Sequence, residues 1–266
     1  MLACDEDCSR PALQMDENAP ATEIALRPRI GLVRSLWGII ATVLSLIYTV
    51  IFSVPSAIGS LFANGHAATP IIRAWSWCII RTCGVRIEME GLENLRGIGP
   101  CVIVSNHQSL FDILASILML PGEVRFVAKK ELLKIPLIGF ILHKSENIVI
   151  DREAGGKAIR RAREVVRHGY SICVFAEGHR FSDNRVHEFS DGAAWLAILN
   201  KLPCVPMAIS GTSTMMPRGA KFVVPGRRMR MKLGTPILTA GLKSGDRAEL
   251  TRKLEAAVRA AFSTEV

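Results

Sequence analysis

The sequence predicts an α/β domain that follows a membrane-associated helical segment, and three observations support this fold class. Apolar strand-like runs alternate with helical patterns from Gly84 onward, which indicates a single α/β domain. The run from Leu36 to Ala63 contains no charged residue and is long enough to cross a bilayer, which requires about 20 apolar residues. The length of 266 residues suits one domain and a modest appendage.

Residues 1–26 are polar and partly acidic, and they include Pro11 and Pro20. This composition predicts a disordered tail. We do not expect a signal peptide here, because the opening residues MLACDEDCSR carry the wrong charge and the apolar run begins too late.

Residues 27–83 are predicted to form a membrane-anchoring helical segment, for which two arrangements compete. A full span would place Arg27, Arg29 and Arg34 on the cytoplasmic side and the large domain across the membrane. A hairpin, interrupted at Pro55 and returning through the amphipathic stretch IIRAWSWCIIRTCG, would keep both ends on one face. We favour the hairpin because the following domain is also basic, although charge alone does not decide. A buried core helix is disfavoured by the length of the uncharged run.

Residues 84–266 are predicted to form the α/β domain, with its motifs within 101–215. Continuous apolar runs of the kind found here fit strands that are covered on both faces. The predicted strands span residues 85–90, 101–106, 124–129, 147–151, 171–177, 203–210 and 229–234. Helical patterns lie near residues 109–119, 155–168, 190–200 and 245–262.

The formal net charge of +9 and the positive mean hydropathy of +0.28 limit the class of partner. A basic chain favours an anionic partner, such as nucleic acid, an anionic lipid surface or a phosphorylated substrate. Aromatic residues make up only 6%, which leaves little for stacking on bases. We therefore predict a membrane or a phosphate as the partner, and no nucleic acid.

The seven cysteines show no paired metal-ligand spacing, and their odd number argues against a disulfide framework. Cys101, Cys173 and Cys204 lie in apolar runs and are predicted to be small buried core residues. No metal site is expected.

The first candidate for chemistry is the segment SNHQSLFD, residues 105–112, which follows a predicted strand. His107 and Asp112 would be about 140° apart on one helix, so they can meet only if His107 precedes the helix. The carboxylate would then fix the imidazole tautomer and leave the other nitrogen as a general base. The alternative is that both residues only cap backbone amides at a helix start.

The second candidate is FAEGHRF, residues 175–181, at the end of another strand. Ligands of α/β sheets bind just beyond the carboxyl ends of strands. Gly178 permits a tight turn, and Arg180 offers a planar fork for a phosphate. Glu177 is predicted to orient its neighbours. A surface turn with a solvated arginine is the competing interpretation.

A third set is basic and also follows strands: Lys129, Lys130 and Arg152. A solvated charge is the default for each of them, but their shared place at strand ends favours convergence with Arg180 on one anion. The arginines at 160, 161, 163 and 167 are predicted to form an exposed helical face.

Nucleophile-elbow, zinc-protease, Walker and dinucleotide motifs are missing, which disfavours those enzyme classes. Four blocks in order instead resemble the PlsC-like glycerolipid acyltransferase family over about residues 85–235. NHQSLFD matches its N-H-x4-D block, and AKKELLKIPLIGFILHKSENIVIDR matches its second block. FAEGHRF matches F-P-E-G-T-R-S, and VPMAISG matches its valine–proline strand.

The resemblance implies a single mixed-sheet glycerolipid-acyltransferase domain, without a cofactor, that acylates lysophosphatidate to phosphatidate. The donor would be acyl-CoA or acyl carrier protein, and the enzyme would lie on the cytoplasmic face of the inner membrane if bacterial. His107 would be the base and Asp112 its orienter. The acceptor phosphate would be held by the residues Lys129, Lys130, Arg152, Glu177, Gly178 and Arg180.

Two residues depart from the family pattern: Ala176 replaces a proline and His179 replaces a threonine. Both flank the expected acceptor site, so another lysolipid, such as a lyso-ornithine lipid, is an alternative acceptor. A non-catalytic lipid-binding protein is a further alternative. A thioesterase is disfavoured because water needs no cluster of cations.

Overall fold

The computed structural model describes residues 31–134, 138–144, 147–150, 155–216 and 219–266. The predicted tail, residues 1–26, lies outside this part of the chain, and so does Arg152.

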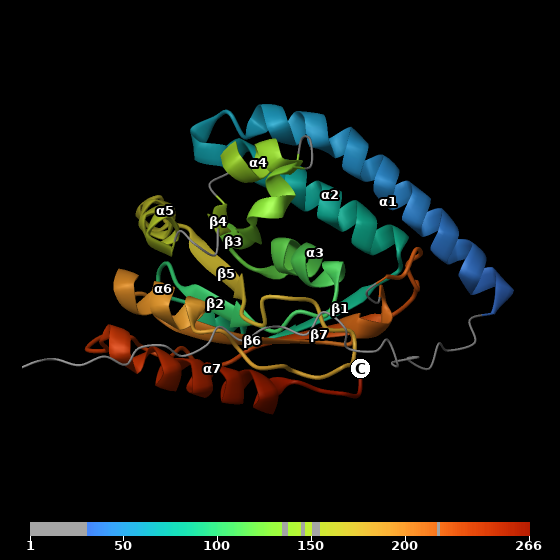
Figure 1. The fold of residues 1–266 in the computed structure, drawn as a ribbon. Coiled ribbons are helices and arrows are strands. Elements are labelled where there is room, and N and C mark those ends of the chain that lie inside the picture. The colour runs from blue at the N-terminus through green and yellow to red at the C-terminus, as the bar shows by residue number, and fades with distance from the viewer. Residues whose placement is uncertain (1–30, 135–137, 145–146, 151–154, 217–218) are drawn as a thin grey trace, which may run out of the picture. The chain divides into compact units, whose positions relative to one another are not determined.

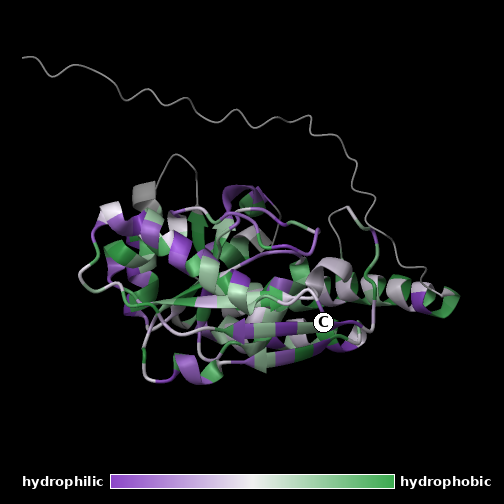
Figure 2. Cartoon of the chain, turned by 90° about the horizontal axis from the view of Figure 1, so that it is seen from below, coloured by the Kyte–Doolittle hydropathy of each residue, from purple (hydrophilic) through white to green (hydrophobic). Residues whose placement is uncertain are grey.

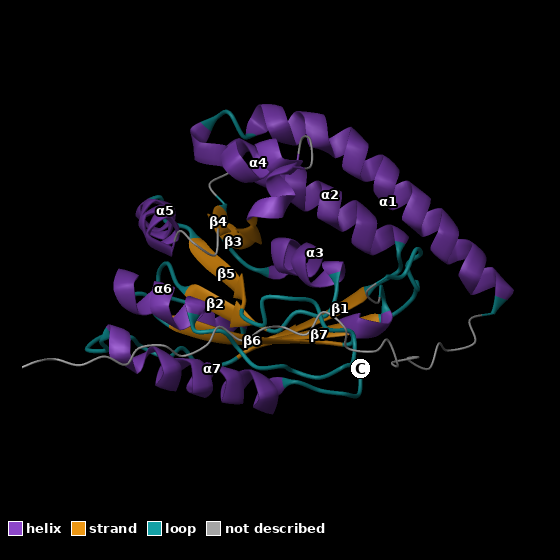
Figure 3. Ribbon diagram, viewed as in Figure 1, coloured by secondary structure: helices purple, strands orange, loops and turns teal. Residues whose placement is uncertain are grey.

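A seven-stranded sheet is the centre of the fold, and each of the seven predicted strands is present (Figure 3). The order across the sheet is β1-β7-β6-β2-β5-β3-β4. The pairing of β6 with β7 is antiparallel and all other pairs are parallel, so the sheet is mixed, as predicted. The strands are β1 (Arg86–Glu90), β2 (Val102–Ser105), β3 (Val124–Lys129), β4 (Ile148–Ile150), β5 (Ser171–Phe175), β6 (Cys204–Ser210) and β7 (Arg228–Leu233).

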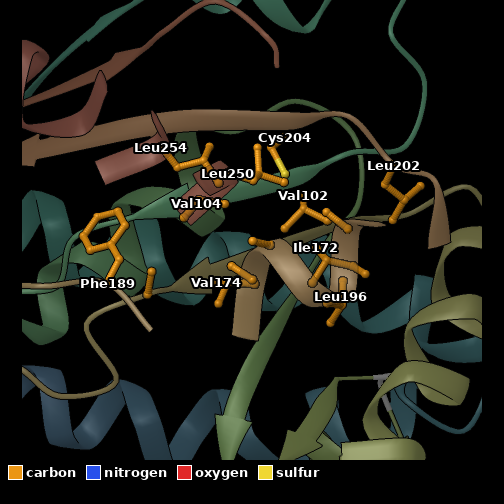
Figure 4. Packing of buried hydrophobic residues seen from close by; sticks show 14 of the residues in the cluster. Val102, Val104, Ile172, Val174, Phe189, Leu196, Leu202, Cys204, Leu250 and Leu254 are labelled. Carbon is orange, nitrogen blue, oxygen red and sulfur yellow. The ribbon is translucent and has the colours of Figure 1, made fainter. Parts of the chain in front are cut away.

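Helices cover both faces of the sheet, because side chains alternate between two hydrophobic cores (Figure 1). On β2, Val102 and Val104 enter the core shared with α5, α6 and α7, part of which Figure 4 shows. Ile103 enters the opposite core, with α2 and α3. The helices on the described chain are α1 (Leu32–Gly59), α2 (Thr69–Thr82), α3 (Leu110–Met119), α4 (Ile138–Lys144), α5 (Gly155–Arg167), α6 (Gly192–Asn200) and α7 (Arg247–Ala261).

Two smaller expectations also hold. Cys101, Cys173 and Cys204 are free and buried in the cores. On the amphipathic helix α5, Arg160, Arg163 and Arg167 are exposed as expected, whereas Arg161 is half-buried and pairs with Glu164 at 2.8 Å. The short helix α4, between β3 and β4, was not predicted.

Helices α1 and α2 form an antiparallel hairpin that packs along the domain (Figure 1). The expectation that Pro55 breaks the first helix is wrong, because α1 continues through it to Gly59. Pro55 lies one turn before the helix end, where the missing backbone donor removes only one hydrogen bond. The hairpin is closed by Trp37 Nε1, which donates to the Thr82 carbonyl at 3.0 Å, and by Trp75 Nε1, which donates to Thr49 Oγ1 at 3.1 Å.

The amino-terminal half of α1 is fixed to the loop between β6 and β7. The Arg34 guanidinium donates to the Pro225 carbonyl at 2.8 Å, and Thr42 Oγ1 accepts from the Val223 amide at 3.0 Å. At Gly38, a Cβ atom would lie 2.4 Å from the Val223 carbonyl oxygen. Glycine is therefore required for this close approach.

The remaining surface of α1 is apolar and uncovered. This 28-residue helix has a mean hydropathy of 2.1 over its most apolar window, of which only 11% is buried. In Figure 2 the part of α1 that extends to the right of the molecule carries mostly hydrophobic and near-neutral colours. By length and composition it is the one helix on the described chain that could cross a membrane.

Candidate active site

The candidate residues lie at the carboxyl edge of the sheet. Strands β2, β5 and β3 are adjacent and parallel, so the segments that follow them leave the sheet on the same side. His107 follows the central strand β2, and Glu177 follows its neighbour β5. Lys129 ends β3, two strand spacings or about 10 Å from β2.

His107 and Asp112 are in contact. His107 precedes α3, and its Nδ1 lies 2.8 Å from Asp112 Oδ2. The imidazole is 12% exposed and the carboxylate is fully buried. The geometry required for a carboxylate-oriented imidazole is therefore present.

Asp112 also caps the helix, so both interpretations of the pair apply at once. Its Oδ2 accepts hydrogen bonds from the Gln108 amide at 2.7 Å and the Ser109 amide at 2.8 Å. Ser109 is the N-cap, and Asp112 at N3 completes a capping box. Because the same oxygen contacts the imidazole, the start of α3 fixes the ring and the carboxylate together.

The free nitrogen of His107 faces no protein partner among the described residues. Its ring stacks on Phe175 at 4.1 Å between centroids, which fixes the ring plane. A nitrogen bonded to a carboxylate carries the proton, so the lone pair lies on Nε2. This arrangement can take a proton from a hydroxyl.

The Glu177 carboxylate joins the segments that carry His107 and His187. Its Oε2 accepts from the His107 amide at 2.8 Å and its Oε1 from the His187 amide at 2.9 Å. Burial raises the pKa of the Glu177 carboxyl above its usual value, against the opposing effect of these two amides. With both oxygens engaged, Glu177 positions the segments on either side, as the residue pattern predicted. The same carboxylate is poorly suited to contact a phosphate directly.

Gly178 and Arg180 form the turn that follows. Gly178 has φ +69°, a conformation that favours glycine, and its amide donates to the Phe175 carbonyl at 3.2 Å. The Arg180 side chain is half-buried and makes no hydrogen bond or ion pair with the described residues. Arg180 is therefore a cation available to an anionic ligand.

The structure brings only part of the predicted cluster together. His107 is bonded to Asp112 through its ring and to Glu177 through its backbone amide. Lys129 and Lys130 are exposed at the end of β3, on the strand next to β5. No group of three or more His, Cys, Asp or Glu side chains on the described chain is placed to hold a metal.

Three further residues shape the site. Asn106 is buried, and its side chain pairs with the backbone of Ile209 through two 2.8 Å bonds, which ties the end of β2 to β6. His187 Nε2 lies 2.9 Å from both oxygens of Asp183. In the sequence, these residues are marked only by an asparagine directly before His107 and by the spacing of Asp183 and His187. Neither pattern is distinctive by itself.

Comparisons with known proteins agree with this description. Residues 86–210 match the family model described as Acyltransferase. The chloroplastic 1-acyl-sn-glycerol-3-phosphate acyltransferase BAT2 of Brassica napus is 33% identical over 156 residues, which are 57% of this chain and 45% of that protein. The 1-acyl-sn-glycerol-3-phosphate acyltransferase beta of Homo sapiens is 30% identical over 183 residues, 67% of this chain and 66% of the human protein. The chain thus spans less than two thirds of these relatives.

A solved structure shares the fold. The crystal structure of the 1-acyl-sn-glycerophosphate (LPA) acyltransferase PlsC from Thermotoga maritima aligns with a TM-score of 0.73 at 24% identity, covering 86% of this chain and 96% of that one.

The mixed sheet, with its N-H-x4-D and E-G-x-R blocks at the carboxyl edge, defines the acyltransferase class of α/β domains. Residues 86–210 match the Acyltransferase family model, and the resemblance seen in the four blocks is confirmed.

Proposed function

We propose that this protein transfers a fatty acyl group from a thioester donor to the free hydroxyl of 1-acyl-sn-glycerol 3-phosphate, which yields phosphatidate. The observation that carries the proposal is the His107 imidazole, with Nδ1 on the buried Asp112 and Nε2 open. The names of the relatives supply the acceptor.

The reaction needs one base and no cofactor. His107 Nε2 takes the proton of the acceptor hydroxyl as its oxygen attacks the thioester carbonyl, and Asp112 stabilises the imidazolium. The new C–O bond forms, the C–S bond breaks, and the thiolate leaves with the proton from His107. The donor is acyl-CoA or acyl carrier protein, and a covalent acyl-enzyme is not required.

The acceptor phosphate would be bound by cations at the sheet edge. Arg180 supports this role because its guanidinium has no described partner and its turn is fixed by Gly178 and Glu177. Lys129, Lys130 and Arg152 would contribute from the neighbouring strand ends. Since Ala176 and His179 flank this region, they are the positions at which acceptor preference would change.

The protein would act at a membrane surface, through the uncovered apolar face of α1. Because α1 is bonded at Arg34 and Trp37 to the domain and to α2, it would lie along the bilayer surface as part of a hairpin. In a bacterium this would be the cytoplasmic face of the inner membrane, where thioester donors are found.

The test is an acyl-transfer assay in detergent with labelled acyl-CoA or acyl carrier protein. The acceptors are lysophosphatidate, glycerol 3-phosphate and a lyso-ornithine lipid. We expect phosphatidate from lysophosphatidate, and a loss of about a hundredfold or more in His107→Ala, since a general base contributes about 10²–10⁴-fold. His168→Ala, an exposed histidine at the opposite end of β5, is the matched control and should retain full turnover.

If product forms only from another acceptor, the role of His107 as base stands and the proposed acceptor is wrong. Absence of product with every acceptor and both donors would favour a non-catalytic lipid-binding protein.

A further inference from the structure

The loop after β5 carries a second histidine–aspartate pair. His187 Nε2 lies 2.9 Å from both Asp183 carboxylate oxygens, and the side chains are 32% and 17% exposed. The His187 ring stacks on Phe181 at 3.8 Å between centroids. The carboxylate and the stacked ring hold this partly exposed imidazole in one orientation.

This loop is bonded to the segment that carries His107. Besides the shared Glu177 carboxylate, the Phe181 amide donates to the His107 carbonyl at 3.1 Å. Gln108 Nε2 donates to the Arg185 carbonyl at 3.3 Å, and Gln108 is almost fully buried. Since the two histidine amides share one carboxylate, the two imidazoles belong to the same cluster of loops.

His187 has an open nitrogen. Nε2 is engaged by Asp183, whereas Nδ1 makes no hydrogen bond to a described residue. An anion that approaches Nδ1 would lie across the ring from the Asp183 carboxylate, and an imidazolium can donate from both of its nitrogens. The imidazolium would then donate from Nδ1 to the anion while Nε2 still donates to Asp183.

The position suits the acceptor phosphate better than a second base. Transfer to one hydroxyl releases one proton, which His107 already accepts. In 1-acyl-sn-glycerol 3-phosphate, the phosphate ester is on the carbon next to the reacting hydroxyl carbon. A hydroxyl at His107 Nε2 therefore brings the phosphate into the adjoining loops, where Arg180 supplies another free cation.

We propose that His187 binds the phosphate monoester of the acceptor and determines its specificity, with Asp183 as its positioning residue. This rests on the proposed function for the identity of the acceptor. The chemistry recognised is a phosphate monoester on a single-chain lipid.

The experiment measures equilibrium binding of lysophosphatidate and of monoacylglycerol, which lacks the phosphate, to the full chain in detergent without donor. In His187→Ala and His187→Gln we expect the Kd for lysophosphatidate to rise about tenfold or more, the effect of losing a hydrogen bond to a charged group. Monoacylglycerol binding should change less than twofold. Asp183→Asn should weaken lysophosphatidate binding to a smaller extent.

Glu188→Gln is the matched control, because Glu188 is the exposed neighbour of His187. Thermal melting identifies any variant that does not fold. If His187→Ala does not fold, His187→Gln provides the test. Unchanged lysophosphatidate binding in the folded His187 variants would overturn the inference, and so would wild-type protein that does not distinguish the two lipids. Selective binding without transfer by the wild type would instead refute the proposed function and retain the site.

Discussion

Asp112 uses a single oxygen for three contacts, and this makes it the most constrained residue of the site. Oδ2 contacts the His107 ring and two backbone amides, whereas Oδ1 is buried and has no hydrogen-bond partner among the described residues. An unpaired buried oxygen is unfavourable, because it has lost its hydration without gaining a partner. The arrangement is stable because a carboxylate is a strong acceptor for N–H donors on its other oxygen.

We predict that Asp112→Asn lowers kcat by about a thousandfold or more, because an amide cannot hold the imidazole in the required tautomer. The same change should lower the free energy of unfolding by about 1 kcal/mol through the weakened capping box. Steady-state kinetics and urea unfolding measure the two effects. A variant with more than a tenth of wild-type turnover would contradict the role given to Asp112.

The residues of the site were predictable only where a motif brings them close in sequence. His107 and Asp112 are five residues apart, and a strand end followed by a helix start forces them together. His187 was missed because its link to His107 depends on Glu177, 70 residues from one and 10 from the other. Convergence of Lys129 with Arg180 on one anion was also expected, and it stays a prediction, since β3 and β5 are neighbouring parallel strands.

At the scale of elements, the contact of α1 with the loop between β6 and β7 depends on one glycine. We predict that Gly38→Ala lowers the free energy of unfolding by about 1–2 kcal/mol. Alanine gains about 1 kcal/mol in helix propensity, but an overpacked contact costs about 1–3 kcal/mol, and a backbone oxygen 2.4 Å away moves little.

Chemical denaturation followed by circular dichroism measures this change. Gly192→Ala, in the first turn of α6, is the control, because a Cβ there meets only Ser190 Oγ at 3.9 Å. It should be neutral or stabilising. Equal stability of both variants would show that Gly38 does not secure α1.

The elements themselves follow from local patterns, whereas their arrangement does not. Strand-like runs of five to eight residues predicted all seven strands, and the continuous apolar runs among them fit central parallel strands that are covered on both sides. The order of strands and the antiparallel β7 depend on contacts between segments far apart in the chain. Helix α1 passes through Pro55 because its packing on α2 outweighs one lost hydrogen bond.

For the whole molecule, the uncovered face of α1 is connected to the site through two helices, α2 and α3. Helix α1 packs on α2, and α2 packs on α3, which carries Asp112 (Figure 1). Ser76 Oγ on α2 donates to the Leu114 carbonyl on α3 at 2.6 Å. A surface that binds lipid is thus connected through two packed helices to the site.

We predict that Leu46→Gln with Val50→Gln lowers binding to phosphatidylcholine vesicles by about tenfold or more. These side chains are 64% and 70% exposed on one helical face, and burial of each in lipid contributes about 1.5–3 kcal/mol. Co-sedimentation measures the change. Leu238→Gln, at a residue 71% exposed on the α/β domain, is the control. Unchanged sedimentation of the double variant would exclude α1 as the membrane contact.

The two hydrogen bonds that Glu177 accepts have a consequence for how the acceptor preference of such a site changes in evolution. One carboxylate accepts from the amides of His107 and His187, so both ends of the segment between Glu177 and His187 are held by hydrogen bonds to the backbone that do not involve the side chains within it. Residues 178–186 can then be exchanged as a cassette between homologues while the reacting imidazole stays in place. New acceptor lipids could be acquired by this route without rebuilding the chemistry.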